Sequence, residues 1–222
     1  MQKALIACSI IFLTACGGGG GDSSQPAPPP PPPEPTAQQL AESSLLLQRA
    51  TFGPSYDDIY NAAQNGLDNW LDTQFSMPSS LHQPIVEQYV EQYGYDLGGY
   101  PPPSFYRRFA FWEQALTAPD QLRQMVAYAL TQIFVVSDNV GMLNNNPIAL
   151  SNYYDMLLNN AFSNFRDLLM AVTLHPAMGI YLSHVNNGKS DPVANTFPDE
   201  NYAREVMQLF SIGLFELNAD GS

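Results

Sequence analysis

The apolar positions of this chain recur at helical spacing from Gln38 onward, and no strand-like alternation persists for more than a few residues. A first stripe of leucines ends at Gly53-Pro54, a pair that breaks helices. Ser55 is a favourable N-cap for the next helix, and Gly66 suits the position just after its last turn. The same spacing predicts further helices over residues 67–75, 85–93, 104–117, 120–134, 149–162, 165–174, 177–182 and 199–213.

Two of these helices carry apolar stripes that predict core faces. Ser104 would cap the first of them, whose stripe is Phe105, Phe109, Trp112 and Leu116. The second would be a central core helix, with the stripe Leu122, Met125, Val126, Ala129, Leu130, Ile133 and Phe134. We therefore expect an all-α fold, an irregular multi-helix array over residues 40–222, rather than four matched bundle helices.

The N-terminus has the order of a bacterial export signal. Lys3 precedes an apolar run from Ala4 to Leu13, which is too short to span a bilayer as a stable helix. The end of the run, Leu13-Thr14-Ala15-Cys16, followed by Gly17, resembles the lipobox of bacterial lipoproteins. The resemblance implies that residues 1–15 are a signal peptide and that Cys16 is the lipidation site.

Residues 16–39 would then form a disordered tether behind the lipid. Five glycines from Gly17 to Gly21 are flexible, and the proline run from Pro28 to Pro33 is a stiff extended spacer. Cys8 would leave with the signal peptide and Cys16 would carry lipid, so no thiol would remain for a disulfide. The domain must therefore be held together by packing alone.

Composition narrows the possible partners. Apolar residues make up 45% of the chain and charged residues only 13%, with a net charge of −13. Such an acidic surface repels nucleic acid and anionic lipid head groups, so we expect no nucleic-acid partner and a membrane attachment through acyl chains. Gly17 is not a retention signal of the Asp type, which favours the outer membrane as the place in the bacterial cell envelope.

Four stretches, in order, resemble a bacterial family known as domain of unknown function 1800. They are Leu46 to Pro54, Gln121 to Ser137, Asn164 to Met178, and the hexapeptide Glu200-Asn201-Tyr202-Ala203-Arg204-Glu205. The resemblance implies a secreted or envelope location and a mostly helical fold, and it supplies no activity. Members often continue past the hexapeptide. Together with the turn-like end Asn218 to Ser222, this leads us to expect that the chain is the N-terminal part of a longer domain. The family also implies, by association, a partner from a second secreted family related to sulfatases.

The hexapeptide supplies the candidate catalytic residues. Glu200 and Arg204 are four apart in the favourable order for an ion pair. Glu205 is a candidate acid/base or metal ligand, with Asn201 and Arg204 orienting an oxyanion. In the competing interpretation the same residues form a buried polar clamp, and the absence of a nearby nucleophile favours that interpretation.

The histidines give weaker signals. His175 is a further catalytic candidate, and His175, His184 and Glu205 could form a metal site across helices. No His-Glu-x-x-His spacing supports that site, so a capping or hydrogen-bonded histidine is the favoured interpretation of His175. Asp191, Asn195, Asp199 and Glu200 form only a weak calcium pattern. The chain has no phosphate-binding glycine loop, and we expect no cofactor.

Two functions remain open from the sequence. The first is a lipid-anchored binding or assembly module that acts with another secreted protein, for which the tether supplies reach. The glycine- and proline-rich segment from Gly94 to Pro103, with its tyrosines, is a candidate binding surface. The alternative is an envelope hydrolase whose site around Glu205, Arg204 and Asn201 is completed by residues beyond Ser222.

Overall fold

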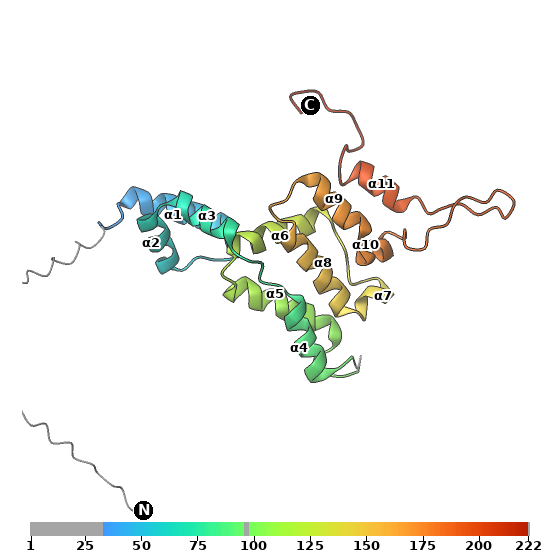
Figure 1. The fold of residues 1–222 in the computed structure, drawn as a ribbon, viewed down its shortest axis with the longest axis horizontal. Helices are drawn as coiled ribbons and strands as arrows, with labels where there is room; N and C mark the ends of the chain where they lie inside the picture. The colour runs from blue at the N-terminus through green and yellow to red at the C-terminus, as the bar shows by residue number, and fades with distance from the viewer. Residues whose placement is uncertain (1–32, 96–97, 222) are drawn as a thin grey trace, which may run out of the picture. The chain divides into compact units, whose positions relative to one another are not determined.

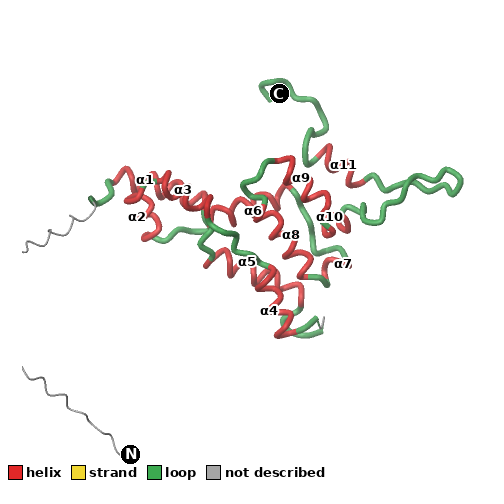
Figure 2. Tube along the Cα trace, viewed as in Figure 1, coloured by secondary structure: helices red, strands yellow, loops and turns green. Residues whose placement is uncertain are grey.

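The computed structural model describes residues 33–95 and 98–221 (Figure 1). The expected signal peptide, Cys16 and most of the expected tether lie outside the described residues. Within the described residues, helices and loops alternate without a strand, and Asp191 and Thr196 form one isolated bridge (Figure 2). The helices are α1 (Ala37–Ala50), α2 (Tyr56–Asn65), α3 (Leu67–Ser76), α4 (Gln83–Tyr93), α5 (Tyr106–Thr117), α6 (Gln121–Ile133), α7 (Gly141–Asn144), α8 (Pro147–Asn159), α9 (Phe165–Leu174), α10 (Pro176–Tyr181) and α11 (Asn201–Gln208).

The prediction of an all-α multi-helix array is thus confirmed. Over the part of the chain that the structure describes, we find no helix with the length and apolar character needed to cross a bilayer.

Local capping explains where the first helices start and stop. A capping box between Thr36 and Gln39 begins α1 at Ala37, inside the range expected for the tether. A second capping box, between Ser55 and Asp58, begins α2, which confirms Ser55 as the N-cap. Gly66 follows α2 with a φ of 90°, a conformation that favours glycine.

The predictions for α5 are wrong in two respects. Ser104 lies inside a 3₁₀ turn, η1 (Pro103–Phe105), and does not cap α5. Trp112 and Leu116 are 60% and 75% exposed, whereas Tyr106 and Ala110 are buried against α4. The buried face of α5 therefore carries Tyr106 and Ala110 instead of the large residues of the predicted stripe. The small side chain of Ala110 lets the neighbouring helix approach closely.

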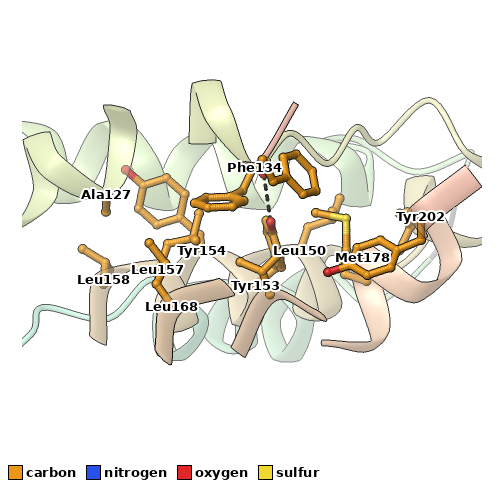
Figure 3. Packing of buried hydrophobic residues seen from close by; sticks show 14 residues of the cluster. Ala127, Phe134, Leu150, Tyr153, Tyr154, Leu157, Leu158, Leu168, Met178 and Tyr202 are labelled. Atoms are coloured by element: carbon orange, nitrogen blue, oxygen red, sulfur yellow. Dashed lines mark hydrogen bonds between the residues drawn. The ribbon is translucent and has the colours of Figure 1, made fainter. Parts of the chain in front are cut away.

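The main core surrounds α8, which packs against α4, α5, α6 and α9. Eight of its thirteen residues are buried. Figure 3 shows Leu157 and Leu158 of α8 in the core together with Phe134 and Leu168. On α6 the predicted stripe is only partly correct, because Ala129 and Ile133 are exposed.

The last helix is shorter than its apolar pattern predicts. Helix α11 ends at Gln208 rather than at residue 213. Tyr202 and Phe210 are buried in the main core. The apolar side chains that follow are exposed: Ile212, Leu214, Phe215 and Leu217. A helix gains most of its stability from burying an apolar face, and residues 211–217 have no such burial.

Candidate ligand-binding cleft

An open cleft of about 440 Å³ lies between α5, α6 and α8, with residues 135–138 along one side. We call it the aromatic cleft. Its volume falls within the range of small-molecule sites, roughly 300–1,000 Å³. Its lining residues are Arg107, Phe111, Tyr128, Thr131, Gln132, Val135, Val136, Ser137, Asp138, Leu150, Tyr153 and Tyr154.

Aromatic rings form much of the wall. The ring of Phe111 lies 5.9 Å from that of Tyr128 and 6.1 Å from that of Tyr154, measured between centroids. Arg107 and Phe111 are four residues apart on α5, so both project from the same face of the helix. Leu150 and Tyr154 share the same spacing on α8. Helical periodicity on two elements therefore brings these side chains to one place.

One end of the cleft is charged. The guanidinium of Arg107 donates to Asp138 at 3.1 Å, and a nitrogen of Arg108 lies 3.7 Å from the same carboxylate oxygen. Two cations thus share one anion. The Nε of Arg107 is buried, and among the described residues it has no hydrogen-bond partner.

Tyr154 holds a second buried donor. Its side chain is 8% exposed, and within the described part of the chain its hydroxyl has no hydrogen-bond partner. Burial raises the pKa of Tyr154, so the hydroxyl keeps its proton. The neighbouring Tyr153 differs, because its hydroxyl donates to the carbonyl of Phe134 at 2.8 Å, the dashed contact in Figure 3. Leaving a buried donor unpaired costs about 1–3 kcal/mol.

The ring of Tyr154 is fixed from behind by His82. The two rings are stacked with centroids 4.3 Å apart. His82 is buried, and its Nε2 pairs with the Gln124 side-chain oxygen at 2.9 Å. Its backbone N–H donates to Asp155 at 2.7 Å. Burial lowers the pKa of His82 to about 4, although the bond to Gln124 and the nearby carboxylate of Asp120 both raise it.

The predicted catalytic residues of α11 lie elsewhere. Arg204 pairs with Glu200 one turn away, as the spacing predicted. Their side chains are 50% and 78% exposed, so this pair is not the buried clamp that we considered. Glu205 and Asn201 are partly buried. None of these four residues lines the aromatic cleft.

The two histidine candidates have separate structural partners. The Nδ1 of His175 accepts from the N–H of Ala177 and caps α10, as the favoured interpretation predicted. Its Nε2 pairs with Asn152 at 2.9 Å. His184 bonds to the carbonyl of Thr173 at 3.1 Å and packs against the ring of Tyr202.

Metal-ligating side chains do not gather in the described part of the chain. Searched over residues 33–95 and 98–221, the structure holds no group of three His, Cys, Asp or Glu residues that could bind a metal. In the weak calcium pattern, Asp191 accepts the N–H groups of Val193 and Ala194 instead. Asp199 likewise accepts from the N–H of Asn201. In the predicted binding segment, residues 96–97 lie outside the described residues, and Tyr100 is exposed.

The residues of the aromatic cleft were not predicted from the sequence. Arg107 and Asp138 are 31 positions apart, and no motif connects them. Tyr154 has the pattern of an ordinary core aromatic. The one available signal was the i, i+4 placement of Arg107 and Phe111 on an amphipathic helix.

Fold and cleft together define an irregular all-α domain with a charged, aromatic-walled cleft between α5, α6 and α8. The family model described as protein of unknown function (DUF1800) matches residues 45–221, and the chain belongs to this family. It matches no curated protein and no solved structure.

The two adjacent tyrosines give a matched test of the unpaired hydroxyl. Tyr154→Phe should raise the free energy of unfolding by about 1 kcal/mol, because it removes a buried group that lacks a partner. Tyr153→Phe should lower it by about 1 kcal/mol, because it removes a satisfied hydrogen bond. Urea denaturation of the two variants measures both values. Equal destabilisation by the two changes would contradict the assignment.

The burial of His82 predicts a specific dependence on pH. The folded state holds His82 neutral down to about pH 4, whereas the unfolded chain protonates near pH 6.5. Stability from this group is therefore complete above pH 6.5 and is lost as the pH falls toward 4, by roughly 3 kcal/mol. The measurement is the difference in unfolding free energy between the wild type and His82→Gln from pH 7 to pH 4. A difference that stays constant would show that His82 titrates normally.

Proposed function

We propose that this protein is a lipid-anchored binding module of the bacterial cell envelope and that the aromatic cleft is its ligand site. One observation carries the second part of the proposal. The side chains of Arg107 and Tyr154 line an open cleft, and each holds one buried donor, the Arg107 Nε and the Tyr154 hydroxyl, that has no partner among the described residues. Buried polar groups are normally satisfied, so each one that is left unsatisfied needs a specific explanation.

Membrane attachment through Cys16 rests on the lipobox-like end of the signal and on the tether that follows. We place the protein at the outer membrane, because Gly17 lacks the character of an inner-membrane retention signal. The partner that we propose is a second secreted protein of the sulfatase-related family, supported by the family association alone. The hydrolase alternative around Glu205 stays an untested prediction.

Lipidation can be tested with the two cysteines. Cys16→Ala should abolish labelling by radioactive palmitate and should release the protein from the membrane fraction. Cys8→Ala should leave both unchanged, because Cys8 would leave with the signal peptide. Globomycin should cause an uncleaved precursor to accumulate. Palmitate labelling that persists in Cys16→Ala would contradict the proposed anchor.

Binding in the cleft can be tested with an uncharged aromatic probe, N-acetylphenylalanine amide. We expect saturation-transfer NMR to show contact between its ring and the wild-type protein. Val135→Trp should remove the effect, because Val135 is 45% exposed, lines the cleft and would fill it. Val193→Trp is the matched control, since Val193 is 97% exposed and lies outside the cleft lining. Equal signals from both variants would place binding elsewhere.

A further inference from the structure

We propose that a second cleft, between α4, α8 and His175, binds a neutral saccharide through its hydroxyl groups. This cleft has a volume of about 520 Å³, and we call it the amide cleft. Among the described residues, none lines both the amide cleft and the aromatic cleft, so the two sites can be tested separately. The proposal goes beyond the function proposed above and does not depend on it.

Four side chains along the amide cleft form a continuous row of hydrogen bonds. The Nε2 of His175 pairs with the side-chain oxygen of Asn152 at 2.9 Å, and the Asn152 nitrogen donates to the side-chain oxygen of Gln83 at 2.8 Å. The Gln83 nitrogen in turn donates to a carboxylate oxygen of Glu87 at 2.7 Å. All four side chains line the cleft and are at least partly exposed, so a ligand can reach them.

The direction of each bond in this row is fixed at its two ends. At one end, the N–H of Ala177 donates to the Nδ1 of His175, so the neutral ring carries its hydrogen on Nε2 and donates it to Asn152. Burial lowers the pKa of His175, which keeps the ring neutral at neutral pH. At the other end, the carboxylate of Glu87 can only accept. The two amides between these ends therefore cannot turn over without losing a hydrogen bond.

Packing holds the row in place before a ligand binds. Gln83 and Glu87 are four residues apart on α4, so they share one face of that helix. The first turn of α4 is tied to α8, because Asp155 accepts the backbone N–H of Gln83 at 2.9 Å. Asn152 and Asp155 are three residues apart on α8 and also share a face. Because these side chains are already positioned, binding would cost little entropy for ordering them.

The unused hydrogen-bonding capacity of the row defines the ligand. The amide nitrogens of Asn152 and Gln83 carry two hydrogens each and use one in the row, and within residues 33–95 and 98–221 neither has a second partner. A ligand must therefore accept from these nitrogens and can donate to the carboxylate of Glu87. A hydroxyl group does both from one atom, whereas an ammonium group only donates and an ionised carboxylate only accepts. The neighbouring hydroxyls of a sugar repeat this capacity around the ring.

Charge and apolar surface also favour a neutral sugar. Over the described residues, the lining includes two carboxyl groups, Glu87 and Asp155, and no lysine or arginine. An anionic ligand would be repelled by these like charges. Leu81, Pro84 and Met156 add apolar surface to the same cleft. Binding sites typically combine apolar surface with a few placed polar groups, and a sugar ring offers a matching C–H face with hydroxyls at its edge.

The test applies saturation-transfer NMR to the intact chain with the neutral trisaccharides maltotriose, cellotriose and triacetylchitotriose. We expect contact from at least one of them, and titration of that signal gives its dissociation constant. N-acetylalanine methylamide offers peptide groups without hydroxyls, and it should bind roughly tenfold more weakly or not at all. The absence of contact from all three trisaccharides would overturn the proposal, and so would equal affinity for the peptide probe.

Variants connect saccharide binding to the row. Asn152→Ala removes a central member, and Glu87→Gln removes the charged acceptor at the end. Each should raise the dissociation constant roughly tenfold, because hydrogen bonds to the ligand are lost, and thermal melting confirms that each variant is folded. Glu91→Gln is the matched control, since Glu91 lies one turn further along α4, is exposed and lies outside the cleft lining.

The same measurements separate binding from a purely structural role. If the row only joins the helices, Asn152→Ala lowers the melting temperature and leaves the dissociation constant unchanged, which would overturn the proposal. Equal effects of Glu87→Gln and Glu91→Gln on the dissociation constant would also overturn it, because the saccharide would then bind outside the amide cleft.

Discussion

The burial of α8 is the constraint on which the rest of the structure depends. Most polar side chains that a surrounded helix buries find partners inside the protein, because water cannot reach them. Asp155 does so by accepting the backbone N–H groups of His82 and Gln83, at 2.7 and 2.9 Å. These are free donors at the first turn of α4, so a carboxylate on the central helix fixes the start of a neighbouring helix. Burial also raises the pKa of the Asp155 carboxyl to about 6.

Local features of the sequence were sufficient to predict that the helices exist and where several of them begin. Ser55 and Gly66 act within their own turn, and their roles can be read without knowing any neighbour. The buried face of α5 could not be read in this way. The large residues of its stripe predict the wrong face, because Ala110 sits where α4 comes close. The end of α11 also depends on tertiary packing, which stops after Phe210.

The candidate site could not be predicted from the sequence, for a different reason. Arg204 and Glu200 were found because an ion pair at i, i+4 is a local property. The aromatic cleft depends on a side chain that lacks a partner, and a missing partner is a property of the whole packed structure. Tyr153 and Tyr154 are identical in type and adjacent in the chain, yet only one hydroxyl is satisfied. No pattern of residue types distinguishes them.

The stacking of His82 on Tyr154 also bears on how the cleft can respond to an occupant. His82 is anchored through its ring to Gln124 on α6 and through its backbone to Asp155 on α8. The ring of Tyr154 is therefore supported by packing before anything binds, and binding would cost little entropy for ordering that ring. Selectivity would then come from excluding poorly shaped molecules rather than from adapting to them.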